Sequence, residues 1–459
     1  MRRLLLLGIA ISTALLGCGN RDGASRPAGA AGNAATGAGG GIAGESAGGA
    51  ARASTTGGAG GDAAGGGASG ATAGSGGRDG TAGLSGNAAG GNAAGGTGGT
   101  TPFYPLDMND VTILAPLPPS SATPVLLRGK DPADDGTAFV PRQLFDQLAA
   151  GRELGSSPVL DAATYDRLQL IAVRFDLCDR HLPGVCPEAE DARMRLVFQP
   201  LHLDGLADDA GFHAFYTVRA DEISGAVAAL RELAMVAPAQ SGALRVSPAL
   251  RAANPEPYAT KLRAFVKRYG GDSRMVRLTM NAQPQLFGQV RWVFRGVEKI
   301  GDAFVDMPLV GGSATDISQS VILDGSSYDV TPITDTPSGL LGAIRQTLFD
   351  AANAAKQRDY LSALAAVENP LTHTAETVAC VACHVTTFVT STRATSASFD
   401  PLTLPARYTS KLDLSTAAGM SSTDRGIRAL GYNRQQPMIS QRVVNDTAQT
   451  LAELEQRYP

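Results

Sequence analysis

The chain has 459 residues, with 43 acidic and 39 basic side chains and a formal net charge of −4. This nearly balanced charge, with no basic run of five or more residues, argues against nucleic acid as a partner. Beyond the first twenty residues there is no apolar run of about eighteen residues, so we expect no transmembrane helix.

The first residues carry the pattern of an export signal. Two arginines precede an apolar run that extends from Leu4 to Leu16. The run is too short to span a bilayer, so it predicts a signal peptide over residues 1–17. It ends in Leu-Leu-Gly-Cys, which resembles the lipobox of bacterial lipoproteins. The resemblance implies that Cys18 becomes the acylated N-terminus, and the alternative is an ordinary secretory signal with an incidental cysteine.

The same resemblance predicts where the protein resides. A lipid anchor at Cys18 would attach the chain to the cell envelope, with the folded part in the periplasm or at the cell surface. Gly19 follows the anchor where an aspartate would be expected for retention in the inner membrane. By resemblance to other Gram-negative lipoproteins, this favours the outer membrane.

Residues 18–101 are dominated by glycine, alanine, serine and threonine. Such a segment cannot bury enough apolar surface to offset its conformational entropy, so we expect it to be disordered. It has no Gly-x-y period with proline, which argues against collagen. A tether and a neutral spacer would have the same composition, and the sequence does not separate these two readings.

Residues 102–335 have alternating and helical apolar patterns that predict an α+β domain. Strands are expected near residues 171–177, 194–198, 212–218, 275–278 and 290–294, because apolar, β-branched and aromatic residues alternate there. Helices are expected after Asp221 and from Pro257 to Gly270. The sequence contains no phosphate-binding loop, nucleophile elbow or His-Glu-x-x-His run, so the role of this segment is not identified.

Two cysteines and three histidines of this segment invite a functional reading. Cys178 and Cys186 lie eight residues apart between two predicted strands, and in an oxidising compartment such a pair predicts a structural disulfide. His181, His202 and His213 are widely spread. We expect each of them to be an ordinary surface or buried residue rather than a metal ligand.

Residues 336–459 have a mainly helical pattern. Apolar residues recur at helical spacing over 340–348 and 360–367, and a final helix is expected from about Ser440 to Arg457. A further helix is expected to begin at Thr374 as N-cap, with Glu376 in its first turn. The sequence leaves open whether this segment packs as one unit with the preceding domain.

The sequence Cys380-Val-Ala-Cys383-His384 lies within this helix. Residues three apart on a helix face the same way, so both cysteines can reach one porphyrin edge and form thioethers. His384 follows directly, and its imidazole can ligate the iron from one side. Here the chain resembles the c-type cytochromes, in which Cys-x-x-Cys-His is the site of haem attachment. The resemblance implies one haem c held by Cys380 and Cys383, with His384 as an axial ligand.

Three alternatives for the motif remain open. A redox dithiol would require a βαβ setting, whereas a loop precedes the motif. A zinc site would require a second pair of ligands, which does not follow at the usual spacing. The third alternative is chance, because the pattern is short.

The sixth iron ligand must come from the face opposite His384. By resemblance to small class I cytochromes, Met438 is the candidate and Met420 is the second choice. Met438 could equally be a core residue, with another ligand or an open site. His373 could serve only if its loop doubled back. Four arginines are available to pair with the haem propionates, namely Arg393, Arg407, Arg425 and Arg442.

These observations favour electron transfer by a membrane-tethered monohaem cytochrome, for which no catalytic residue is expected. The redox partner would be another protein, which the sequence does not identify. Two alternatives are an exported binding or sensing lipoprotein and a haem-dependent enzyme with its site in the middle segment.

Overall fold

The computed structural model describes residues 104–459, except for 121–125, 152–159, 179–186, 188–189, 238–241, 284, 287–288, 311–316, 325–326, 375 and 415–426. The predicted signal peptide, the tether, Cys18, Cys186, Met420 and Arg425 therefore lie outside the described residues.

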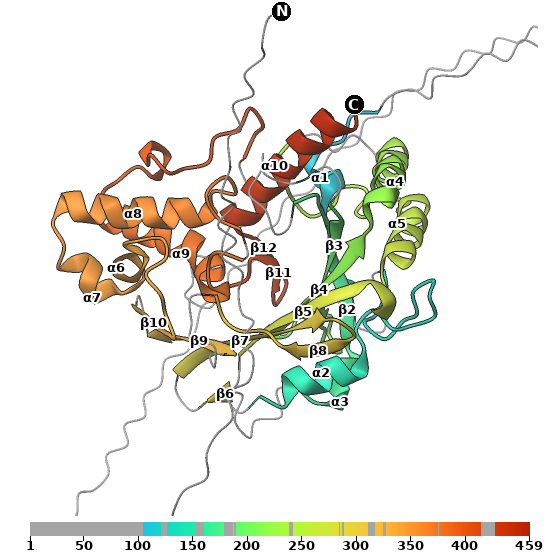
Figure 1. The fold of residues 1–459 in the computed structure, drawn as a ribbon, viewed down its shortest axis with the longest axis horizontal. Coiled ribbons are helices and arrows are strands. Elements are labelled where there is room, and N and C mark those ends of the chain that lie inside the picture. The colour runs from blue at the N-terminus through green and yellow to red at the C-terminus, as the bar shows by residue number, and fades with distance from the viewer. Residues whose placement is uncertain are drawn as a thin grey trace, which may run out of the picture. The chain divides into compact units, whose positions relative to one another are not determined.

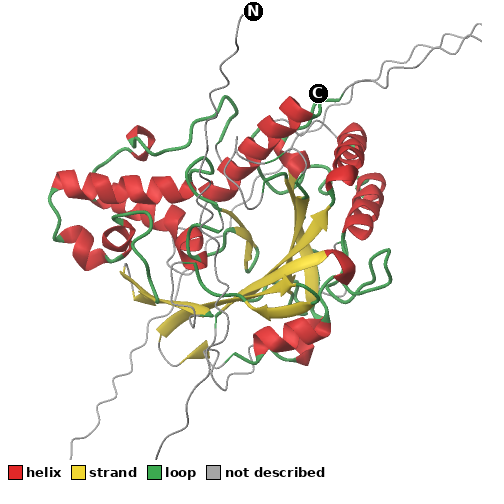
Figure 2. Cartoon of the chain, in the orientation of Figure 1, coloured by secondary structure: helices red, strands yellow, loops and turns green. Residues whose placement is uncertain are grey.

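A large antiparallel sheet organises the fold (Figures 1 and 2). Its strands pair in the order β1-β2-β3-β4-β5-β7-β9-β10, and β6 and β8 also pair with β7. The strands are β1 (Thr112–Leu114), β2 (Leu168–Asp176), β3 (Ala192–Pro200), β4 (Ala210–Val218), β5 (Met275–Ala282), β6 (Gln285–Leu286), β7 (Gln289–Ile300), β8 (Ala303–Asp306), β9 (Ser318–Asp324) and β10 (Ser327–Thr331).

Helices cover both faces of this sheet. In Figure 1, α2 to α5 lie below and to the right of the strands, whereas α6 to α9 lie to the left and α10 at the top. The helices are α1 (Met108–Val111), α2 (Arg142–Ala149), α3 (Ala162–Asp166), α4 (Ile223–Val236), α5 (Glu256–Tyr269), α6 (Leu340–Ile344), α7 (Gln346–Asp350), α8 (Ala354–Glu368), α9 (Cys380–Ser396) and α10 (Gln441–Arg457). The mixed α+β class expected from the sequence is confirmed.

Alternation along β4 divides its side chains between two environments. Phe212 and Tyr216 point toward α2 and α3: Phe212 packs on Phe145, and the Tyr216 hydroxyl donates to the carbonyl of Phe139. His213 lies on the opposite face, where it meets α9. The central strand therefore faces the apolar core on one side and the motif helix on the other.

The described residues before and after 335 belong to one compact unit. One apolar core joins the sheet to α2–α5 and α10, and a second joins β7, β9 and β10 to α6–α9. Since strands contribute to both cores, the C-terminal helices depend on the middle segment for their packing.

Several predicted elements are present and three details differ. The predicted stripe over 340–348 is broken at Arg345 into α6 and α7, and Leu348 is 42% exposed. A two-stranded sheet that the sequence did not predict, β11 (Leu430–Asn433) paired with β12 (Gln436–Ile439), precedes the last helix. The motif helix also begins later than expected, for a reason given below.

Candidate functional site

The motif helix α9 starts at the first cysteine of the motif. Its N-cap, Ala379, has no side chain that could accept a hydrogen bond. The backbone N–H of Val381 instead donates to Oε1 of Gln319 on β9, at 2.9 Å. A buried glutamine from a distant strand thus satisfies one of the free donors at the helix start.

The prediction of Thr374 as the N-cap is wrong in its position. Thr374 Oγ1 accepts a hydrogen bond from the N–H of Glu376, and Thr377 Oγ1 accepts one from the N–H of Thr374. These bonds close a local turn that ends before α9 begins. Glu376 pairs with Arg277 of β5, which ties this turn to the sheet.

His384 is held in one orientation by its Nδ1 atom, which lies 2.8 Å from the carbonyl oxygen of Ile427. A carbonyl can only accept, so Nδ1 carries the proton and Nε2 keeps its lone pair. Among the described residues Nε2 has no hydrogen-bond partner. Phe294 of β7 packs edge-on against the ring, with 5.0 Å between ring centres. The arrangement fixes the imidazole in the tautomer that could ligate a metal through Nε2.

Both motif cysteines are free thiols. Burial raises the pKa of Cys380, and it raises the pKa of Cys383 to about 11. A reactive redox dithiol requires a lowered thiol pKa, so this environment does not favour dithiol exchange. The preceding element is α8 rather than a strand, which removes the βαβ setting as well.

The zinc alternative also lacks support in the described part of the chain. No group of three or more histidine, cysteine, aspartate or glutamate side chains there has an arrangement that could hold a metal ion. A structural zinc site would require four such ligands.

The motif side chains lie deep in the protein but are not completely covered by it. Burial dominates the pKa shifts of Cys380, Cys383 and His384, and burial also lowers the pKa of His384 to about 4. Each of the three nevertheless keeps a partly exposed surface, as does His213 opposite them. These four side chains could therefore contact a bound group without a large rearrangement of the fold.

Arginines from the sheet surround this site. Arg195 of β3 and Arg277 of β5 lie over the ring of Phe215 on β4, at 4.6 and 5.4 Å from its centre. The positive charges of Arg195 and Arg277 oppose the rise in the pKa of the motif thiols. Both guanidinium groups also pair with carboxylates, Arg195 with Asp176 and Arg277 with Glu376.

Two of the arginines that the sequence suggested as partners for the haem propionates, Arg393 and Arg442, have different surroundings. Arg393 is fully buried and donates to the carbonyls of Ala343 and Ile344, so it serves the packing of α6. Arg442 donates to the carbonyls of Val367 and His373. Its charge also acts on the Cys383 thiol.

Two consecutive residues, Ile427 and Arg428, connect the site to β7 and to the residues just before β4; we call this pair the strap. Ile427, which accepts from His384, is followed by Arg428, whose guanidinium lies 5.0 Å from the ring centre of Trp292. The same guanidinium donates to the carbonyl of Asp208 at 2.7 Å and contacts the carboxylate of Asp209 at 3.3 Å. Arg428 thus fixes the backbone carbonyl that orients the histidine.

The predicted sixth ligand, Met438, lies on β12 opposite Gly431 and is 0% exposed. It is buried within the hairpin and has no exposed surface. The imidazole of His373 is engaged within its own turn, where its Nδ1 lies 3.1 Å from Thr377 Oγ1. Met420 lies outside the described residues.

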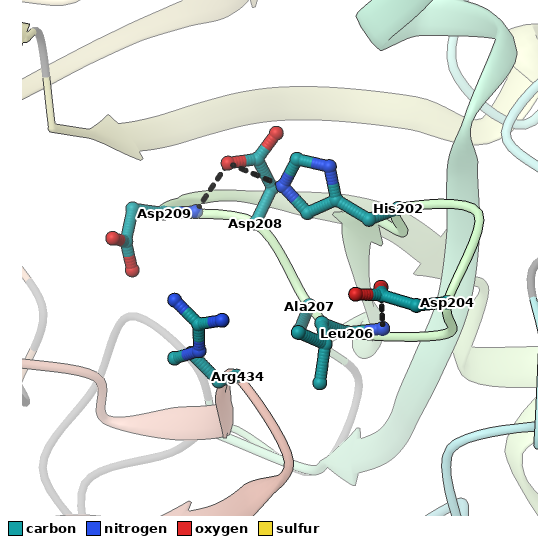
Figure 3. Close-up of a pocket in the computed structure, with 7 residues that line it drawn as sticks. All are labelled: His202, Asp204, Leu206, Ala207, Asp208, Asp209 and Arg434. Carbon is teal, nitrogen blue, oxygen red and sulfur yellow. Dashed lines mark hydrogen bonds and ion pairs between the residues drawn. The ribbon is translucent and has the colours of Figure 1, made fainter.

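One surface pocket lies apart from the motif (Figure 3). It has a volume of about 290 Å³ and is bordered by His202, three aspartates and Arg434. The His202 ring faces Asp208, with 3.5 Å between Nε2 and the carboxylate. No residue of the motif borders it, so it does not belong to the same site.

Cys178, at the end of β2, is disulfide-bonded. Its predicted partner Cys186 lies outside the described residues.

Sequence reasoning overlooked the contribution of the middle segment to the site. His213, Phe215, Arg195 and Arg277 all come from strands β3 to β5, which were given no role. The alternating pattern predicted these strands but not which of their faces would meet the motif helix.

Comparison with known proteins adds no assignment. No protein-family model, curated protein or solved structure matches the chain. Among the described residues, no helix is long and apolar enough to cross a membrane.

Proposed function

We propose that the protein is a membrane-tethered monohaem c-type cytochrome that transfers electrons in the cell envelope. The observation that carries the proposal is the first turn of α9. There two free thiols and an imidazole fixed through Nδ1 lie together, and each side chain keeps a partly exposed surface. This donor set fits a haem bound through two thioethers and one axial nitrogen.

Three residues of the chain would hold the haem. Cys380 and Cys383 would form the thioethers, and His384 would ligate the iron through Nε2. The hydrogen bond from Nδ1 to Ile427 fixes the imidazole and raises its basicity. When bound, haem supplies a one-electron iron couple.

The arginines of the sheet would be near the charged groups of a haem. Haem carries two propionates, and planar guanidinium groups suit carboxylates. Arg195 and Arg277 already pair with Asp176 and Glu376, so a propionate would join or replace those ion pairs. Arg442 is the propionate candidate from the C-terminal segment that lies near Cys383. We therefore propose that the middle segment forms one wall of the haem site.

Cys18 would anchor the chain to the outer membrane, and the glycine-rich segment would let the folded part reach a redox partner. Both assignments rest on the sequence alone. The alternative functions, a haem-dependent enzyme or a sensing lipoprotein, require an iron position that a small molecule can reach.

A redox titration with a ligand-binding assay tests this proposal. The mature protein would be produced with the haem-attachment machinery and checked for one covalent haem by intact mass. We expect reversible one-electron reduction, no rapid binding of CO and no turnover of peroxide. Rapid CO binding or peroxide turnover would contradict the electron-transfer role and favour the sensor or the enzyme.

A further inference from the structure

A histidine of the middle segment lies directly opposite the motif histidine. His213 is on β4, where it pairs in register with Val197 of β3 and Thr279 of β5. Its ring centre lies 6.0 Å from that of His384, with 66° between the ring planes. The sheet and α9 thus present one imidazole each to the same region.

The His213 ring faces the motif and is not sealed inside the protein. Among the described residues its ring contacts that of His384, and it keeps a partly exposed surface on that side of the sheet. Its ring is therefore placed to share a ligand with His384.

The separation of the two rings suits a shared metal ion. A bond of about 2 Å from metal to imidazole nitrogen, plus about 1 Å from nitrogen to ring centre, puts two axial imidazole centres about 6 Å apart. The observed 6.0 Å agrees with this value. Met438, by contrast, is 0% exposed within its hairpin.

We propose that His213 is the second axial ligand of the haem iron, so that His384 and His213 bind it from opposite sides. This inference rests on the proposed function and deepens it. It makes the site bis-histidine and predicts a lower reduction potential than a histidine–methionine site would have. It also explains why a large sheet domain accompanies a single haem motif, because that domain supplies a ligand.

The test is the electronic and electron paramagnetic resonance spectrum of the haem-loaded full chain. The wild-type protein should be low-spin, without the long-wavelength charge-transfer band of methionine sulfur on ferric iron. His213→Ala should lose the low-spin signal and bind CO, and added imidazole should restore the low-spin spectrum. Met438→Leu should keep the wild-type spectrum. His202→Ala is the matched control, because it removes an exposed histidine near the same strands.

The possible outcomes distinguish an error in the ligand assignment from an error in the proposed function. A methionine–iron band in the wild type, lost in Met438→Leu, would overturn the assignment of His213. A high-spin wild-type spectrum would overturn it too, because the sixth position would then be open. A low-spin spectrum that survives in His213→Ala would likewise refute it. Absence of covalent haem from the wild type would instead refute the proposed function itself.

Discussion

The strap formed by Ile427 and Arg428 gives the most specific prediction of stability. The side chain of Arg428 is 3% exposed, and its guanidinium makes three interactions that alanine would remove. Its charged hydrogen bond to the Asp208 carbonyl is worth about 1.5–3 kcal/mol. Its position over Trp292 adds about 1–2 kcal/mol. The ion pair with Asp209, which is 45% exposed, adds less than about 1 kcal/mol.

We therefore expect Arg428→Ala to lower the free energy of unfolding by about 3–5 kcal/mol. The assay is urea unfolding followed by far-ultraviolet circular dichroism. Fluorescence of Trp292, the single tryptophan of the chain, serves as a local probe. Arg434→Ala is the matched control, because Arg434 is exposed on the same hairpin, and it should change stability by less than about 0.5 kcal/mol. A loss below about 1 kcal/mol for Arg428→Ala would refute the view that this side chain anchors the strap.

Three further predictions concern the surroundings of the site. Gly431 has φ +145°, and an added Cβ would lie 2.5 Å from Gln199 Oε1. Gly431→Ala should therefore lower the free energy of unfolding, measured in urea, by about 2–3 kcal/mol. An unchanged unfolding midpoint would contradict this. Gln319→Leu should lower the free energy of unfolding by about 1–3 kcal/mol, because it leaves the N–H of Val381 and the carbonyl of Pro332 without these partners. An unchanged free energy of unfolding would show that α9 does not need this cap. Burial raises the pKa of Glu368 to about 7, so the folded protein binds this proton more tightly than the unfolded chain does. Stability should therefore fall as pH rises from about 4.5 to above 7, by on the order of 3 kcal/mol, and Glu368→Gln should remove that part of the fall; parallel pH profiles for the two proteins would refute it.

The elements that the sequence predicted are those whose apolar period is complete within one segment. α5 is an example: Leu262, Phe265 and Val266 are buried on one face, and Gly270 is its C-cap. α10 begins after Ser440, whose side chain accepts from the N–H of Val443, as local capping rules predict. Such signals require no knowledge of the rest of the fold.

The errors arose where a distant residue decides local structure. α9 starts at Cys380 because Gln319 on β9 accepts from its first turn, and nothing near Thr374 reveals this. The β11–β12 hairpin contains Pro437 and turns at Arg434, which has a positive φ, and both features read as loop. Its first strand is bound by the side chain of Gln199 on β3, a distant contact that the local sequence does not reveal.

The motif was visible from the sequence because its chemistry depends on three neighbouring positions. The opposite wall of the site was not visible. His213 meets His384 only because β4 is central in the sheet and turns that side chain toward α9. An alternating pattern predicts two faces for a strand, but it does not say which element each face will meet.

The account depends most directly on covalent attachment of haem at Cys380 and Cys383. The measurement is the reduced pyridine haemochrome spectrum of the mature protein, produced with the haem-attachment machinery, beside a Cys380→Ala variant. We predict a c-type α-band with one haem per chain in the wild type, and a shifted or lost band in the variant. Absence of haem from the wild-type protein, or identical spectra for the two proteins, would contradict the assignment of the motif.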